Sequence, residues 1–370
     1  MKLEQVELRH LRLPLLHHFE TSFSRVYSQE VVLVAVDSGG IRGWGECAAG
    51  AGPFYSAEDV QTCLHALKDF LVPWALEVDF KSANDLARVA RRIRGHSIAK
   101  AGLEMALWDW FARAQDEPLS RMYGGTRESI EAGVSLGIED TVEALLERIG
   151  AFASRGYRRV KVKVKPGWDV GILERIRSKF PQLPLMADAN AAYTLADAET
   201  LKGMDRFGLT MLEQPLDHDD LTDHAALARV IETPICLDES IKKPADAEKA
   251  ISLGACKIIN IKPARVGGPA NAIEIHDHCV DRGVPVWCGG LLESGVGRCH
   301  NIAIASLPGF VLPGDISGSD RYWQEDIIEP PVVARADGTI AVPTAVGLGH
   351  EVVLERVERR TVWTESIRHA

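Results

Sequence analysis

From about residue 130 onward, short apolar runs alternate with helical stretches, and this rhythm constrains the fold more than any other feature of the sequence. The runs recur about every 22 to 27 residues, and a helical pattern fills most of the gaps. Such repeated strand–helix units predict a parallel α/β barrel; the alternative is an open doubly wound sheet, but no Gly-x-Gly-x-x-Gly turn follows any run. The eight runs are 132–138, 159–164, 185–187, 209–212, 235–237, 257–261, 284–288 and 311–312.

The first 125 residues follow a different pattern. Three strands are expected at 3–14, 30–37 and 40–47, the middle one rich in β-branched residues. Helical patterns follow at 57–72, 82–94 and 97–115, so this part predicts an α+β module. The last 45 or so residues lose the barrel rhythm, and we expect them to pack back against the first module.

Bulk properties exclude several classes of protein. A net charge of -10, with no segment rich in Lys and Arg, argues against nucleic acid as a partner. No apolar run approaches the ~20 residues of a membrane span, and the start of the chain lacks a signal-peptide core. Seven cysteines without a Cys-x-x-Cys pair indicate reduced thiols, which predicts a cytoplasmic protein.

Polar side chains end the apolar runs, where catalytic groups of a parallel barrel lie. Asp188, Glu213 and Asp238 end the third, fourth and fifth runs. Three converging carboxylates repel one another unless a cation lies among them, although single acids could instead cap helices or be solvated. Oxygen ligands without His or Cys favour Mg²⁺ over Zn²⁺, with Mn²⁺ as a substitute. Asn190 and Glu239, beside two of these acids, are expected to support them.

Three lysines, Lys161, Lys163 and Lys262, complete the candidate site, whereas Lys165 is expected at the strand mouth or on the surface. Lys161, Lys163 and Lys165 alternate along the second run and share one face, while Lys262 ends the sixth run, nearly opposite in a barrel. A lysine shielded from water near a cation has a lowered pKa and can act as a base near neutral pH. A carboxylate held between Lys163 and Lys262 could lose its neighbouring proton, and the metal would stabilise the enediolate. Lys161 could assist; the alternative is an exposed strand studded with lysines.

This arrangement resembles the enolase superfamily in its muconate-lactonizing branch, over nearly the whole chain. The resemblance implies a capping α+β domain at 1–125 and a modified TIM barrel, (β/α)7β, at 126–325. It also implies a C-terminal segment, 326–370, that returns to the cap. The motifs that match in order are Lys161-x-Lys163, Asp188-x-Asn190, Glu213-Gln214-Pro215, Asp238-Glu239-Ser240 and Lys262.

Segments 19–23, 45–47, 52–56, 165–169 and 287–290 are similar to the o-succinylbenzoate synthase and N-succinylamino acid racemase group. The similarity implies that Lys163 and Lys262 are the acid/base pair and that the three acids bind Mg²⁺. In the synthase reaction Lys163 would take the proton and help expel hydroxide; in racemisation the two lysines would alternate. The residues expected to shape the substrate pocket are Phe19, Thr21, Ser22, Phe23, Tyr55, Ser135, Arg265, Gly290, Leu291, Glu293 and Asp315.

Alternatives remain within and outside this group. Leu291 stands where the family usually has Met, and Ala264 where it has Gly, which leaves the pocket shape open. The seventh run lacks the His of mandelate racemase relatives, and Asp315 is only half of the Asp-x-Asp of dipeptide epimerases, which favours an uncharged N-acyl or carbocyclic substrate. The resemblance implies dehydration to o-succinylbenzoate as the main reaction, and Arg265, three residues after Lys262, resembles members that also have racemase activity. The alternatives are racemisation as the main activity, a muconate cycloisomerase and an inactive binding barrel. The resemblance also implies menaquinone synthesis and a homo-oligomer, with a small-molecule carboxylate as substrate.

Overall fold

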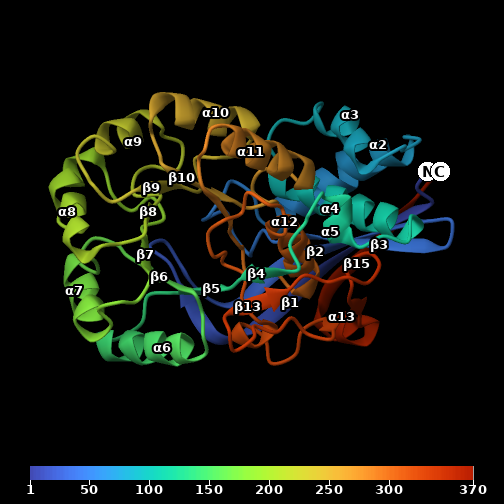
Figure 1. Ribbon diagram of the computed structural model, residues 1–370. Coiled ribbons are helices and arrows are strands. Elements are labelled where there is room, and N and C mark those ends of the chain that lie inside the picture. Colours follow the sequence, from blue (N-terminus) through green and yellow to red (C-terminus); the bar gives the residue numbers. More distant parts are fainter. Residues whose placement is uncertain (370) are drawn as a thin grey trace.

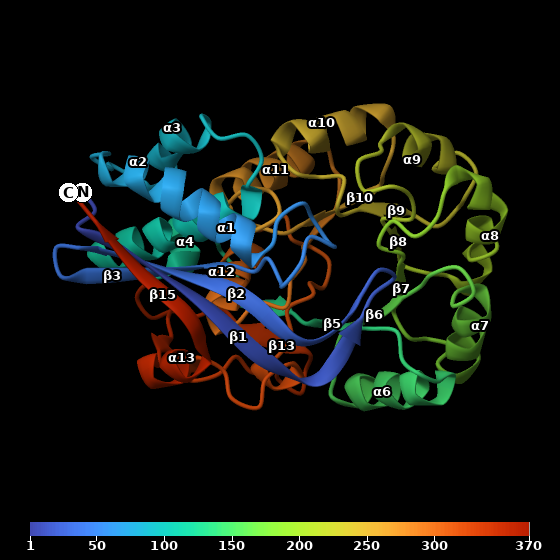
Figure 2. The ribbon, with the colours of Figure 1, turned by 180° about the vertical axis from the view of Figure 1, so that it is seen from behind.

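The computed structural model describes residues 1–369 and contains two packed parts (Figure 1). One part is built on an antiparallel sheet of order β15-β1-β2-β3, where the last strand of the chain pairs with the first (Figure 2). Pro14 lies beyond the β15 pairing, which ends at Leu11, so its missing N–H interrupts only one ladder. The strands are β1 (Gln5–Glu20), β2 (Arg25–Ser38), β3 (Ile41–Cys47) and β15 (Thr361–Arg368).

Helix α4 (Ser97–Ala114) is the main helical layer on this sheet, and it is buried along most of its length. Glycines on β3 allow its close approach, because a Cβ on Gly43 or Gly45 would overlap the helix backbone. The predicted helices are confirmed in outline, although the one at 57–72 is divided by a π-helical turn at Leu67–Leu71. The other helices here are α1 (Val60–Ala66), α2 (Val72–Leu76), α3 (Ala87–Ala90) and α5 (Leu119–Met122).

The other part is a curled parallel sheet of seven strands in consecutive order, with helices on its outer side (Figure 1). Its strands are buried on both faces, because helices cover the outside and a second core fills the inside. The strands are β5 (Gly133–Leu136), β6 (Arg159–Lys163), β7 (Leu185–Asp188), β8 (Leu212–Glu213), β9 (Ile235–Leu237), β10 (Ile258–Ile261) and β11 (Val286–Cys288). The helices are α6 (Val142–Ser154), α7 (Val170–Lys179), α8 (Ala198–Lys202), α9 (Thr222–Leu227), α10 (Pro244–Leu253), α11 (Pro269–Asp281) and α12 (Gly295–Ala305).

The predicted eighth strand at 311–312 is wrong as a regular strand. The segment still closes the ring, because Phe310 bridges Val286 on one side and Gly314 bridges Ala132 on the other. Pro313 follows the predicted run and has no N–H to donate, which explains why the ladder does not extend. The barrel prediction is therefore confirmed, with seven full strands and two single bridges at the eighth position.

The remaining elements come from the last part of the chain, together with β4, which directly precedes the first barrel strand. They include two small sheets, β4 (Ser129–Glu131) with β13 (Thr339–Ala341) and β12 (Ile328–Glu329) with β14 (Glu351–Val352), and helix α13 (Leu354–Arg360). The division of the chain at 125 and 325 stays a prediction. All seven cysteines are buried and free, as expected for reduced thiols. Within residues 1–369, no helix has both the length and the apolar character to cross a membrane.

Candidate active site

Three acidic side chains meet at the carboxyl ends of neighbouring barrel strands. Asp188 ends β7 and Glu213 ends β8, and their Cα atoms are register partners. Asp238 follows β9 directly, and all three side chains are fully buried. The parallel register therefore brings together the acids that the sequence places at successive strand ends.

Each of these carboxylates accepts a hydrogen bond from a lysine. Lys163 Nζ lies 2.6 Å from Asp188 Oδ2, and Lys262 Nζ lies 2.7 Å from Asp238 Oδ2. Lys161 Nζ lies 2.8 Å from Glu213 Oε2 and 3.2 Å from Asp188 Oδ2. Three buried carboxylates are thus matched by three buried lysines, which avoids leaving any of these charges unpaired.

The acidic groups that surround Lys262 and Lys161 raise the pKa values of both lysines above their ordinary value. Burial is the largest single influence on Lys262 and would lower its pKa, but the neighbouring acidic groups, Asp238 first, together hold the pKa above its ordinary value. Burial is likewise outweighed at Lys161, whose pKa is raised by Asp315 and then Glu213. The predicted lowering applies to lysines beside a bound cation, which would neutralise the acids in place of the lysines, and it stays a prediction for that state.

Two polar residues just after the strands adopt left-handed backbone conformations and orient the charged groups. Asn190 has φ 44° and Gln214 has φ 36°, values that are uncommon outside glycine and that cluster at functional sites. Asn190 Oδ1 accepts from Lys163 at 2.6 Å, and its Nδ2 donates to Glu239 at 2.9 Å. Gln214 Oε1 accepts from the backbone N–H of Asp238 at 3.0 Å.

Tyr55 reaches the site from the capping part, and Arg265 lies behind it. The Tyr55 hydroxyl donates to Asp238 Oδ1 at 3.0 Å and accepts from Lys262 at 3.0 Å. Arg265 also donates to Asp238, while its Nε bonds the Ile241 carbonyl at 2.7 Å. Because the Arg265 guanidinium donates its hydrogen bonds to these fully buried partners, it positions Asp238 and does not face the open cavity.

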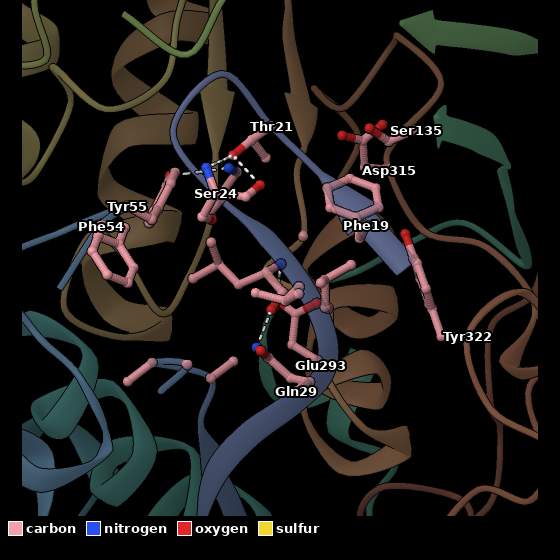
Figure 3. A pocket seen from close by; sticks show the side chains of 18 of the residues that line it. Phe19, Thr21, Ser24, Gln29, Phe54, Tyr55, Ser135, Glu293, Asp315 and Tyr322 are labelled. Atoms are coloured by element: carbon pink, nitrogen blue, oxygen red, sulfur yellow. Dashed lines mark hydrogen bonds between the residues drawn. The ribbon is translucent and has the colours of Figure 1, made fainter. Parts of the chain in front are cut away.

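A cavity of about 170 Å³ lies above Lys163 and Lys262, between the barrel mouth and the cap. Figure 3 shows Phe54 and Tyr55 on one side, Phe19 and Tyr322 on the other, and Gln29 and Glu293 along a third wall. The Phe19 ring lies 6.0 Å from Lys163 Nζ. The predicted residues that line this cavity are Phe19, Thr21, Phe23, Tyr55, Ser135, Lys161, Lys163, Asn190, Lys262, Gly290, Leu291, Glu293 and Asp315.

Other predicted residues lie outside the lining. The carboxylates of Asp188, Glu213 and Asp238 sit below the cavity floor, with Glu239 beside them. Ser22 instead donates to the Asn190 carbonyl at 3.1 Å, so it holds the loop from residue 19 to 24 on the barrel. The sequence reasoning missed lining residues such as Gln29, Arg298 and Tyr322, because they come from elements whose local pattern carries no polar strand-end signal.

The donor set fits a hard divalent cation. The three acids offer only oxygen ligands, and Glu239 Oε2 and Asn260 Oδ1 are buried beside them without a hydrogen-bond partner. Burial, followed by the charge of Asp188, raises the pKa of Glu213 to about 8, a cost that a cation would offset. As the side chains are placed in residues 1–369, no three His, Cys, Asp or Glu residues form a metal cluster, since the carboxylates face lysines.

Comparison with known proteins assigns the chain to a family. Residues 144–357 match the enolase C-terminal domain-like family, and residues 5–124 match the N-terminal domain of mandelate racemase and muconate lactonizing enzyme. An o-succinylbenzoate synthase of Geobacillus stearothermophilus is 52% identical over 98% of this chain and 96% of its own length. An N-succinylamino acid racemase of Thermus thermophilus is 44% identical, with 98% of each chain covered.

Solved structures agree with this assignment. The crystal structure of an enolase superfamily member from Listeria innocua has a TM-score of 0.95 and 40% identity, and covers 100% of this chain and 99% of its own. With its strand-end acids, its paired lysines and these matches across the whole length, the chain belongs to the enolase superfamily.

Proposed function

We propose that this enzyme removes the proton beside the carboxylate of a small substrate, and that its main reaction is the dehydration that yields o-succinylbenzoate. The observation that carries the proposal is the placement of two lysines at one cavity, Lys163 at the end of β6 and Lys262 just after β10, with three buried carboxylates at the ends of the strands between them. Relatives at 52% and 51% identity bear the name o-succinylbenzoate synthase, which supports this choice of reaction.

The chain's own residues would carry out the proton transfers. Lys163, held by Asn190, takes the proton and later protonates the departing hydroxyl group, so that water leaves. Lys262, held by Asp238 and Tyr55, stays protonated and stabilises the enediolate from the opposite side. Bound Mg²⁺, for which Mn²⁺ would substitute, would supply positive charge to the substrate carboxylate and lower the pKa of the nearby lysines.

Racemisation of N-succinylamino acids is the second candidate. Two relatives at 44% and 45% identity are named N-succinylamino acid racemase, and the reaction needs the same two lysines. Lys163 and Lys262 would then alternate as base and acid on the two faces of one α-carbon. We propose that both reactions occur, in the cytoplasm, in a homo-oligomer and, for the synthase, on the way to menaquinone.

The test is a side-by-side assay of the purified protein with Mg²⁺. One substrate is the cyclohexadiene precursor of o-succinylbenzoate, followed by its loss of absorbance. The other is an N-succinylamino acid in deuterated water, followed by NMR at the α-carbon. The same assays are run after chelation of the metal and after its return, which tests the cofactor separately.

The possible results separate the candidates. Fast dehydration with slow exchange makes the enzyme chiefly a synthase, and comparable rates mean two activities. Exchange at the α-carbon without dehydration would indicate a racemase of amino acid metabolism. Binding of Mg²⁺ without turnover of either substrate would refute the substrate choice. If the protein neither binds Mg²⁺ nor converts either substrate, the mechanism is refuted.

A further inference from the structure

One wall of the cavity is a short loop in an unusual conformation. The loop Gly290–Glu293, here called the 290–293 loop, follows β11 and leads into α12, and each of its four residues lines the cavity. Leu292 has φ 59°, a left-handed conformation that costs free energy for a residue with a side chain. Such a conformation persists only where surrounding contacts impose it, so the contacts that hold this loop decide the shape of the wall.

Glu46, at the end of β3 in the capping part, makes a dense set of contacts just after this loop. Its Oε1 accepts from the backbone N–H of Ser294 at 3.0 Å, and its Oε2 accepts from that of Gly297 at 3.0 Å. The Ser294 hydroxyl also donates to Oε2. Glu46 is only 1% exposed, so these donors replace water around a buried carboxylate at the N-terminus of α12.

A second contact from the cap holds the loop itself. Gln29 of β2 donates from Nε2 to the carbonyl of Leu291 at 2.7 Å (Figure 3). The backbone N–H of Leu291 donates in turn to Glu293 Oε1 at 2.8 Å. The 290–293 loop is therefore held at its centre by Gln29, and the residues directly after it, Ser294 and Gly297, are held by Glu46. Gln29 and Glu46 come from neighbouring strands of the capping sheet.

We propose that Glu46 is a positioning residue that sets the 290–293 loop against the part of the substrate remote from the reacting carboxylate, and thereby selects among substrates. Glu46 does not line the cavity and lies outside the lysine and carboxylate cluster, so it acts only through the loop. The proposal rests on the proposed function for its substrates. In this proposal the capping part controls substrate selection through Glu46, whereas the barrel lysines carry out proton transfer.

Glu104 provides a matched control. It is also a buried carboxylate of the capping part that accepts from a barrel helix, here the backbone N–H of Ala270 at 2.7 Å in the first turn of α11. Burial raises the pKa of both carboxyls to about 7. No residue of α11 lines the cavity, so Glu104 shares the chemistry of Glu46 without a bond to residues that directly follow the pocket wall.

The experiment compares Glu46→Gln with Glu104→Gln. A Gln at position 46 keeps the size of the side chain but places an N–H where one of the three donors now points. We expect the ratio of the two kcat/KM values, for the cyclohexadiene and for an N-succinylamino acid, to change by about tenfold in Glu46→Gln, because misplacement of binding groups by ~1 Å costs up to ~100-fold. In Glu104→Gln the ratio should stay at the wild-type value.

A purely structural role would lower both reactions together and leave their ratio unchanged, which would overturn the proposal. Gln29→Leu, which removes the other contact to the loop, should change the ratio in the same direction; an opposite change would also count against it. Thermal unfolding establishes that each variant is folded. If Glu46→Gln does not fold, Ser294→Ala replaces it, because this variant removes the hydrogen bond from the Ser294 hydroxyl to Glu46.

Amide hydrogen exchange gives a readout that needs no substrate. Residues 290–297 should exchange faster in Glu46→Gln than in Glu104→Gln, since only the first variant loosens the loop. Equal exchange in the two variants would overturn the role of Glu46 even if the proposed function holds. If the wild type converts neither substrate, the proposed function fails while the exchange result still decides whether Glu46 holds the loop.

Discussion

Glu104 gives a prediction about the pH dependence of stability. Its carboxylate accepts from the Ala270 N–H at 2.7 Å and from Trp108 Nε1 at 3.2 Å, and neither donor carries a charge. Burial therefore raises the pKa of Glu104 from its ordinary 4.5 to about 7. Because the folded-state pKa lies above the unfolded one, the folded protein holds the extra proton between these values, and stability falls as the pH rises through this window.

The size of the effect follows from the two pKa values. Moving the pKa of Glu104 from 4.5 to about 7 corresponds to about 3 kcal/mol, since each pH unit is worth about 1.4 kcal/mol. Most of it, about 2.5 kcal/mol, should be lost between pH 5 and pH 8, and little more above pH 8. Glu104→Gln removes the ionisation and keeps an oxygen acceptor for Ala270, so the variant should lack this part of the pH dependence.

The measurement is urea unfolding of wild type and Glu104→Gln at several pH values from 5 to 8.5. The difference between the two free energies of unfolding removes other titrating groups, such as Glu46, that contribute to both curves. We expect the variant to gain about 2.5 kcal/mol relative to wild type over this range. Parallel curves would refute the reasoning, because they would mean that the helix α11 amide compensates fully for burial of the charge.

Three further predictions concern the site and its support. Lys163→Ala and Lys262→Ala should each slow α-proton exchange by ~100- to 10,000-fold, the usual value of a general acid or base, as measured by NMR. Trp287→Ala should lower the free energy of unfolding by about 3 to 5 kcal/mol in urea unfolding, because the fully buried indole fills the barrel interior. Glu20→Gln, which breaks a 3.2 Å ion pair with Lys165, should raise KM only a few-fold, since partly exposed pairs contribute about 1 kcal/mol or less.

Each of these predictions has its own control. For the lysine variants, unchanged Mg²⁺ binding shows that the carboxylates are intact, and exchange within tenfold of wild type would contradict the assigned roles. For Trp287→Ala, the oxygen-rich site above should still bind Mg²⁺ once folded; a loss below 1 kcal/mol would mean that the interior collapses around the gap. For Glu20→Gln, added salt should reduce the difference from wild type, and a salt-independent difference would argue against an ion-pair role.

The sequence by itself determined the barrel and the chemistry at its mouth. The alternating lysines lie on β6, and the acids lie at the ends of β7 and β8 and just after β9. Their positions could be predicted because side-chain direction along a strand follows from local geometry. Parallel strands end at the same edge, so Asp188, Glu213 and Asp238 had to meet once the strand order was sequential.

Only the tertiary structure decided how the ring closes and what surrounds the site. The segment 310–314 closes the barrel by single bridges to partners that are more than 20 residues away in the chain. The apolar residues of this segment predicted a strand, but Pro313 has no N–H with which to extend the ladder. Arg265 was expected in the pocket, but it lies behind Asp238, because a buried carboxylate there competes for the guanidinium.

The capping contacts were beyond sequence reasoning for the same reason. Gln29 contacts the 290–293 loop, and Glu46 contacts the residues directly after it, across about 250 residues of chain. The local sequence around Gln29 and Glu46 does not indicate these partners. Periodicity records which face of an element is buried, which is a local property. Packing over the whole molecule decides which two faces meet and which helix end a buried charge contacts. This packing also shapes the pocket wall.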